Sequence, residues 1–284
     1  MKKLTRSVVM AAAMGILVGL SGAAYGGVVT LADGSSTVKI ETESSLGVFG
    51  WSIGELSVLE HQWFWFRTNL PEWNAREYSI DELGTPNVLQ IPVMPNLAIL
   101  TYTEERADPA DPPRFSVQVT YMLTSGAGLL SADLMENVKV TNLSNSTLTF
   151  DIFQYSDFDL SGDDLDHSIA ITGGNRVLQT GYGPALITLS ETVTTGSPDL
   201  SEVAVFSTTF DKLTNGGIDD LDGSKVGHGP ADLTWAFQWS ERSIAPGQAF
   251  MISKDKLLTV EPIPEPAGLG LIGLALLAVR RKRS

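Results

Sequence analysis

Short runs of alternating apolar and polar residues, separated by turns rich in Gly, Asn, Ser and Asp, recur along most of this 284-residue chain. The clearest runs cover 137–142 and 147–153, and the polar turn 143–146 joins them. An alternation of period two places the apolar side chains on one face of a β-strand. Strands of this kind bury their apolar faces by packing two sheets together. The pattern therefore predicts an all-β fold, an antiparallel β-sandwich, in which these two runs form a hairpin.

The same reasoning predicts strands elsewhere and marks segments that cannot be central strands. Pro92 and Pro95 lack the N–H that a sheet needs, so this segment is expected at an edge or in a connection, and 108–113 is expected in a loop. Segment 199–213 fits either a helix or a strand. Further strands are predicted at 36–43, 47–53, 56–67, 97–103, 114–123 and 129–141, with a final hairpin formed by 233–239 and 248–254.

The amino-terminal end has the three parts of a signal peptide. A basic segment, 1–6, precedes an apolar core at 8–20, and small residues follow it at 21–26. Cleavage after Ala24 or after Gly26 satisfies the small-residue preference of signal peptidase. The alternative is an uncleaved transmembrane helix, which the short core disfavours. A signal peptide is therefore predicted at 1–24.

The carboxyl-terminal end is a short apolar stretch with a basic end. The uncharged residues 267–279 form a helix of about 20 Å, shorter than the ~30 Å hydrocarbon core. The cluster Arg280, Arg281, Lys282 and Arg283 resists translocation and is expected to stay cytoplasmic. We therefore predict a short C-terminal hydrophobic helix that inserts only transiently in the inner membrane; the alternative is an ordinary anchor that is never cut.

A proline motif, Pro264–Glu265–Pro266, precedes this stretch. Together, the motif, the Leu- and Gly-rich stretch and the basic cluster resemble the PEP-CTERM sorting signal of bacteria that make exopolysaccharide and biofilm matrix. The sequence departs from that signal only at Ile263, where Val is commoner. The resemblance implies that signal peptidase and an exosortase-like protease process the chain and pass it to the cell envelope or the exterior.

The resemblance describes sorting and not an activity. The same tail occurs on some ice-binding proteins, and the body, at 153–160 and 252–256, resembles uncharacterised PEP-CTERM proteins. The expected organisation is a signal peptide at 1–24, a β-sandwich domain at 25–260 and a sorting segment at 261–284.

The charge of the central segment limits its partners. Residues 25–266 keep all 33 acidic residues but only 12 of the 19 basic ones, which gives a net charge of −21. A field of this sign repels phosphate backbones and anionic lipid surfaces, so no nucleic-acid partner is expected. The chain has no cysteine, which excludes disulfides and thiolate chemistry.

One acidic turn has the spacing of a calcium loop. The oxygen-bearing residues Asp157, Asp159, Ser161 and Asp163 alternate along the chain, with Gly162 between the last two. Alternate oxygens can converge on Ca²⁺, and glycine permits the sharp turn. The second half departs from the pattern, because Ser168 stands where a bidentate Glu is expected. Calcium is therefore the one cofactor considered, and the alternative is a solvated Asp/Gly turn.

An aromatic run, 61–67, contains Trp63 and Trp65, which share one face of a strand. A sheet covered on both sides would bury both rings. The alternative is that the two rings are exposed and stack on sugar rings, which would fit a matrix protein.

Catalytic motifs are absent from the sequence. The three histidines, His61, His167 and His228, lack metal-ligand spacing, and no nucleophile elbow, phosphate loop or H-E-x-x-H motif occurs. Adjacent acids such as Glu104 and Glu105 point to opposite faces of a strand and so make a poor catalytic pair. We therefore expect an exported cell-envelope or biofilm-matrix protein with a non-enzymatic structural or binding role. The alternative is a carbohydrate-binding or carbohydrate-active β-sandwich protein that acts on exopolysaccharide.

Overall fold

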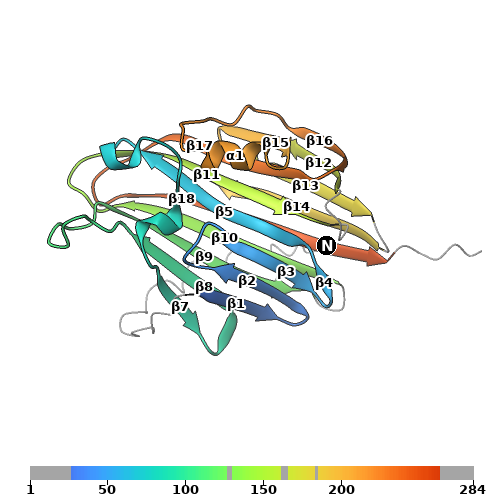
Figure 1. Ribbon diagram of the computed structural model, residues 1–284. Helices are drawn as coiled ribbons and strands as arrows, with labels where there is room; N and C mark the ends of the chain where they lie inside the picture. Colours follow the sequence, from blue (N-terminus) through green and yellow to red (C-terminus); the bar gives the residue numbers. More distant parts are fainter. Residues whose placement is uncertain (1–26, 127–129, 161–165, 183–184, 263–284) are drawn as a thin grey trace, which may run out of the picture.

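The computed structural model describes residues 27–126, 130–160, 166–182 and 185–262. The predicted signal peptide and the C-terminal motif, apolar stretch and basic cluster lie outside these residues. Two antiparallel sheets of nine strands each pack face to face in the described part of the chain (Figure 1), so the predicted all-β sandwich is confirmed. No helix among the described residues has the length and apolar composition needed to cross a bilayer.

The first sheet has the strand order β1-β2-β3-β5-β11-β17-β15, with β4 paired to β3 and β6 paired to β5. Its strands are β1 (Val28–Asp33), β2 (Ser36–Glu41), β3 (Val48–Ile53), β4 (Leu56–Ser57), β5 (Leu59–Thr68), β6 (Tyr78–Ser79), β11 (Leu148–Phe158), β15 (Leu200–Val205) and β17 (Leu233–Ile244).

The second sheet has the order β16-β12-β13-β14-β18-β10-β9-β8-β7. Its strands are β7 (Asn87–Ile91), β8 (Met94–Thr103), β9 (Phe115–Ser125), β10 (Ser131–Asn142), β12 (Asp166–Thr172), β13 (Arg176–Tyr182), β14 (Ala185–Thr195), β16 (Val226–Ala231) and β18 (Ala249–Pro262).

The two predicted hairpins are wrong, although all four of their arms are strands. β10 lies in the second sheet and β11 in the first, and the same holds for β18 and β17. The chain therefore crosses from one sheet to the other at 143–147 and at 245–248. Asn142 joins the two crossings, because its side-chain amide donates to the carbonyl oxygens of Ser146 and Ile244, both at 2.7 Å. Alternation alone cannot distinguish a hairpin from such a crossing, since both arms bury one face in either arrangement.

Other sequence predictions agree with the structure. Residues 92–95 lie at the tip joining the edge strand β7 to β8, and 108–113 lies in the connection from β8 to β9. Segment 199–213, which fitted either a helix or a strand, contains both: β15 is followed by the helix α1 (Thr208–Thr214).

The first sheet is covered on both faces. Residues 62–68 of β5 are all buried, including those that point away from the second sheet. On the face that points away from the second sheet, α1 covers β5 (Figure 1); the short 3₁₀ helices η1 (Pro71–Trp73) and η2 (Ile80–Leu83) also contact this strand. The ring of Trp65, for example, packs edge-on against Phe210 of α1, 6.2 Å between centroids. Double coverage explains why β5 is aromatic at successive positions rather than at alternate ones.

Arg67 of β5 connects the sheet to neighbouring loops through ion pairs. Its guanidinium forms ion pairs with Glu77 at 2.7 Å, Asp151 at 2.7 Å and Asp220 at 2.5 Å. Glu77 is almost fully buried. One cation thus joins a strand of the sheet to two segments far apart in the sequence.

Four charged side chains lie between the two sheets and are completely buried. We call them the charge cage: Glu136 of β10, Glu191 of β14, and Lys254 and Lys256 of β18. Glu136 contacts the two lysine Nζ atoms at 2.5 and 2.6 Å, whereas Glu191 lies 3.5 and 3.4 Å from them. Opposite charges alternate, which is how buried ions compensate for lost hydration.

Candidate functional site

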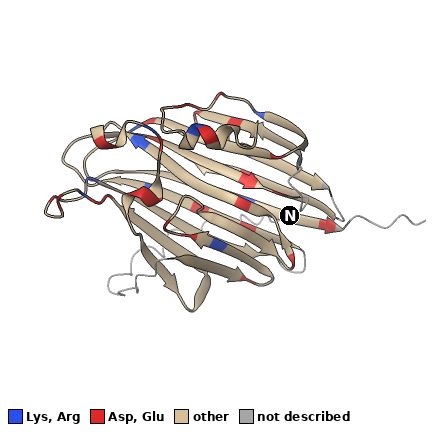
Figure 2. Ribbon diagram, in the orientation of Figure 1, with Lys and Arg blue, Asp and Glu red and all other residues tan. Residues whose placement is uncertain are grey.

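A cavity of about 230 Å³ opens at the end of the sandwich where η1 meets the connection between β8 and β9. We call it the first cavity. Figure 2 shows acidic and basic residues close together on the loops beside η1. The lining residues are Glu72, Trp73, Glu104, Glu105, Arg106, Ala107, Asp108, Asp111 and Arg114.

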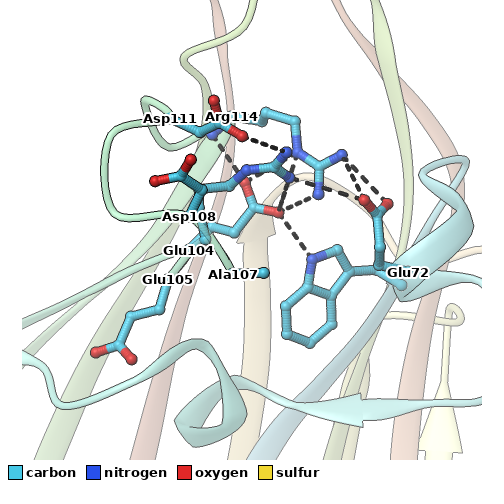
Figure 3. A pocket seen from close by; sticks show the side chains of 9 residues that line it. Glu72, Glu104, Glu105, Ala107, Asp108, Asp111 and Arg114 are labelled. Carbon is cyan, nitrogen blue, oxygen red and sulfur yellow. Dashed lines mark hydrogen bonds and ion pairs between the residues drawn. The ribbon is translucent and has the colours of Figure 1, made fainter.

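Glu104 organises the first cavity (Figure 3). Its carboxylate accepts hydrogen bonds from the indole Nε1 of Trp73 at 2.9 Å and from the backbone N–H of Arg114, also at 2.9 Å. The guanidinium of Arg114 donates to the same carboxylate through Nε, at 3.1 Å, and through Nη2. Burial by itself would raise the pKa of Glu104, but the hydrogen bonds from Arg114 and Trp73 outweigh it, so the pKa lies below its ordinary value. Glu104 is therefore an ionised anchor and not a proton donor.

The two arginines of the first cavity are held differently. Arg114 donates to Glu104 and, through Nη1, to Glu72 at 3.2 Å. Arg106 makes only long contacts, 3.5 Å to Glu104, 3.8 Å to Glu72 and 3.6 Å to Asp111. Its buried Nε has no hydrogen-bond partner among the described residues. Arg106 consequently retains donor capacity that Arg114 has already used.

Trp73 supplies the apolar part of this cavity. Its ring packs against Phe66 and Phe115 at centroid distances of 5.4 and 6.2 Å, and it stays partly exposed. Sequence reasoning missed this residue, because it sits on η1 outside the strand pattern. The signal that could have found Trp73 is its position in a turn, where no strand pattern assigns a large aromatic side chain to the core.

Trp63 and Trp65 are buried, as expected for a sheet covered on both sides, and their exposed fractions are 0% and 1%. Their surroundings also differ, since Trp63 packs against Tyr102 of β8, 6.0 Å between centroids, whereas Trp65 lies under α1. The two rings therefore form no exposed stacking platform in this structure.

Asp157 and Asp159 of the predicted calcium loop lie close together, and Asp232 joins them from the β16–β17 junction. One carboxylate oxygen from each lies within 4.8 Å of the others. Asp157 also accepts a hydrogen bond from the Tyr155 hydroxyl at 3.2 Å. An all-oxygen donor set of this kind suits Ca²⁺. The other two predicted ligands, Ser161 and Asp163, lie outside the described residues, so calcium binding stays a prediction.

A carboxylate pair lies on the outer face of the second sheet. Asp133 of β10 faces Leu257, and Asp255 of β18 faces Met135, which makes the two acids diagonal neighbours across adjacent strands. Burial and the charge of Asp255 raise the pKa of Asp133 to about 6. Burial also raises the pKa of Asp255. This pair can hold a proton near neutral pH, which Glu104 cannot.

Comparisons with known proteins identify the fold. No protein-family model matches the sequence, and no curated protein matches it. A protein from Synechocystis is 9% identical, with a TM-score of 0.51 over 87% of this chain and 100% of that one. A bacterial glucoamylase complexed with acarbose is 9% identical, with a TM-score of 0.52, and the match covers 87% of this chain but 34% of the glucoamylase. A galactose mutarotase related enzyme from Lactobacillus acidophilus is 10% identical, with a TM-score of 0.47 over 82% of this chain and 97% of that one. At these identities the likeness concerns the fold, which this chain shares with the Synechocystis protein and with part of the glucoamylase.

Proposed function

We propose that this chain is an exported carbohydrate-binding protein and that the first cavity holds the sugar. The observation that carries the proposal is the combination of a partly exposed indole, Trp73, with the guanidinium groups of Arg106 and Arg114 and several carboxylates. The apolar face of a sugar ring packs on an aromatic ring, while its hydroxyls donate to carboxylates and accept from guanidinium groups. This chain shares its fold with part of a bacterial glucoamylase whose structure contains acarbose, which is in line with a carbohydrate ligand.

The charges of the first cavity favour a neutral sugar. Five acidic residues line it, Glu72, Glu104, Glu105, Asp108 and Asp111, against two arginines. Uronic acids and sugar phosphates would meet a net negative wall, and the strongly acidic chain adds to that repulsion. Binding is also favoured over acid–base catalysis here, because Glu104 is ionised and already accepts several hydrogen bonds.

Titration calorimetry of the full-length chain with neutral oligosaccharides tests the proposal. Replacing Arg106 by Gln removes a charged donor to the ligand, so affinity should fall by roughly tenfold or more. The matched control is Arg76→Gln, because Arg76 forms a partly exposed ion pair with Glu82 and does not line the cavity. Equal affinities of the two variants and the unaltered chain would contradict the assignment of this cavity.

A second candidate function is a carbohydrate-active enzyme that uses Asp133 and Asp255. Diagonal neighbours on adjacent strands lie about 7–8 Å apart, with their Cβ atoms somewhat closer, so rotation of the two side chains can bring their carboxyl groups to the separations of roughly 5–9.5 Å that glycosidases use. The raised pKa of Asp133 suits a general acid. Release of reducing ends from polysaccharides between pH 4 and 8, lost in Asp133→Asn, would support this function. Absence of any release across that range would refute it.

We also propose that the PEP-CTERM-like tail sorts the protein to the cell envelope or the exterior. The ordered series of Pro264–Glu265–Pro266, an apolar stretch and a basic cluster supports this route. Signal peptidase and an exosortase-like protease would then remove the two ends. Mass spectrometry of the exported protein should find both ends trimmed, and an intact basic terminus outside the cell would contradict the route.

A further inference from the structure

A second cavity adjoins the first one. Its volume is about 330 Å³, and its lining residues are Glu43, Asp81, Gly84, Thr85 and Glu105. Glu105 lines both cavities, so the two cavities adjoin at this residue.

The backbone at the end of β8 sets the position of this residue. Glu104 and Glu105 are consecutive, and their side chains diverge as adjacent residues of an extended chain do. Figure 3 shows the Glu105 carboxylate pointing away from the network around Glu104. The backbone N–H of Glu105 donates to the carbonyl oxygen of Leu83 at 3.1 Å, which fastens this residue to η2.

Gly84 makes room for the Glu105 carboxylate. A Cβ atom at position 84 would collide with it, and the positive φ of Gly84, 119°, disfavours any other residue there. The absence of a side chain at position 84 therefore leaves space for the Glu105 carboxylate beside the backbone that lines the second cavity.

The floor of the second cavity is held in place. Asp81 accepts hydrogen bonds from the buried indole of Trp63, at 3.0 Å, and from the hydroxyl of Ser79. Ser79 also begins η2 with a capping box that includes Glu82. The remaining lining side chains, Glu43 and Thr85, are exposed and offer hydrogen-bonding oxygens.

We propose that the two cavities are adjoining subsites for consecutive units of one neutral glycan chain, with Glu105 contacting the chain where it passes between them. This inference rests on the proposed function. The first cavity, at about 230 Å³, is smaller than the ~300–1,000 Å³ of typical ligand pockets, and the second, at about 330 Å³, lies at the lower end of that range, so each is of a size for a short part of a ligand. A chain that occupies both subsites should therefore bind with higher affinity than a free monosaccharide, which occupies one.

The test is a chain-length series. Calorimetric titration of the full-length chain with cello-, malto- and manno-oligosaccharides of one to six units should show affinity rising by roughly tenfold or more once a chain reaches both cavities. Thr85→Trp fills the second cavity with an indole. This variant should lose the additional affinity for the longer oligosaccharides and keep the affinity for the shortest oligosaccharide that binds. Thr124→Trp is the matched control, because Thr124 is exposed at the opposite end of β9 from Arg114.

The outcomes separate this inference from the proposed function. If no oligosaccharide of any length binds, the proposed function itself fails. If oligosaccharides bind with one affinity at all lengths, or if Thr85→Trp leaves the gain intact, the two-subsite inference is overturned and the proposed function stands. Should Thr85→Trp fail to fold by circular dichroism, Glu43→Trp blocks the same cavity from the connection between β2 and β3 and decides the question in its place.

Discussion

Removing one carboxylate of the charge cage tests how the buried ions stabilise the sandwich. Glu136 accepts close contacts from Lys254 and Lys256 and a hydrogen bond from Gln62 at 3.1 Å, with all four side chains fully buried. Glu136→Gln keeps the shape but leaves two lysines facing a single, more distant carboxylate. Breaking a buried pair by removing one partner costs about 3–5 kcal/mol. For a domain of this size that corresponds to a fall in Tm of roughly 10 °C.

The matched variant is Glu191→Gln. Glu191 lies 3.4–3.5 Å from the lysine Nζ atoms and accepts no contact as short as the 2.5–2.6 Å ion pairs of Glu136. A hydrogen bond to a charged group contributes about 1.5–3 kcal/mol, so Glu136→Gln should cost at least about 1 kcal/mol more than Glu191→Gln. Urea unfolding of both variants measures the difference. Equal losses would refute the reasoning that the close contacts dominate the cage.

The pH dependence of this loss follows from Lys254. Burial lowers the pKa of Lys254 from 10.5 to about 8, even with Glu136 beside it. The unfolded chain therefore binds more protons than the folded one between about pH 8 and 10.5, and the contribution of Lys254 to stability rises with pH in that window. Without the Glu136 charge the pKa should fall further. The deficit of Glu136→Gln should thus be smaller at pH 9 than at pH 7, and a larger deficit at pH 9 would contradict the assignment.

Three further predictions concern other charged groups. If the cluster of Asp157, Asp159 and Asp232 binds Ca²⁺, thermal unfolding should occur at a higher temperature with calcium than with chelator. Asp157→Asn should abolish this difference. Coincident unfolding midpoints for the unaltered chain would exclude the site. Because the pKa of Asp133 is raised from 3.8 to about 6, its ionisation lowers the stability of the folded chain as pH rises through this window. Asp133→Asn should therefore stabilise the chain by about 1 kcal/mol at pH 7, after allowance for solvent screening, and by much less at pH 4. Urea unfolding midpoints at the two pH values check this. Arg67→Met leaves the buried Glu77 without its cation and should lower stability by about 3–5 kcal/mol, whereas Arg242→Met, which breaks a more exposed pair with Asp199, should lower it by about 1 kcal/mol or less; similar losses in chemical unfolding would contradict this account.

The sequence predicts the strands better than it predicts their partners. On β10 every second residue is buried, and on β18 the same holds from Ile252 to Leu258, although three of the buried side chains are the charged Glu136, Lys254 and Lys256. The crossings at 143–147 and 245–248 look like hairpin turns because a few polar residues can either reverse a strand or span the roughly 10 Å between sheets. Only the pairing of β11 with β5 and β17 decides between them, and that depends on residues far away in the chain.

In the candidate sites, too, the sequence predicts local features but not contacts between distant residues. Neighbouring acids could be judged from sequence, since Glu104 and Glu105 diverge as predicted. The partners of Glu104 could not be found in this way, because Trp73 and Arg114 come from different loops and share no spacing with it. Likewise, Asp232 reaches Asp157 and Asp159 only because β17 lies beside β11 in the first sheet.

The place of β18 has a consequence for the order of folding. This last described strand is inserted between β14 and β10, with eleven residue pairs to β10 and ten to β14, so it forms the middle of its sheet. The two halves of the second sheet cannot join until β18 has been synthesised. A high average sequence separation of contacts of this kind slows folding. The domain should therefore complete its folding only after β18 has been synthesised rather than strand by strand, and the proposed cleavage of the tail would have to fall beyond Pro262 if the sheet is to remain whole.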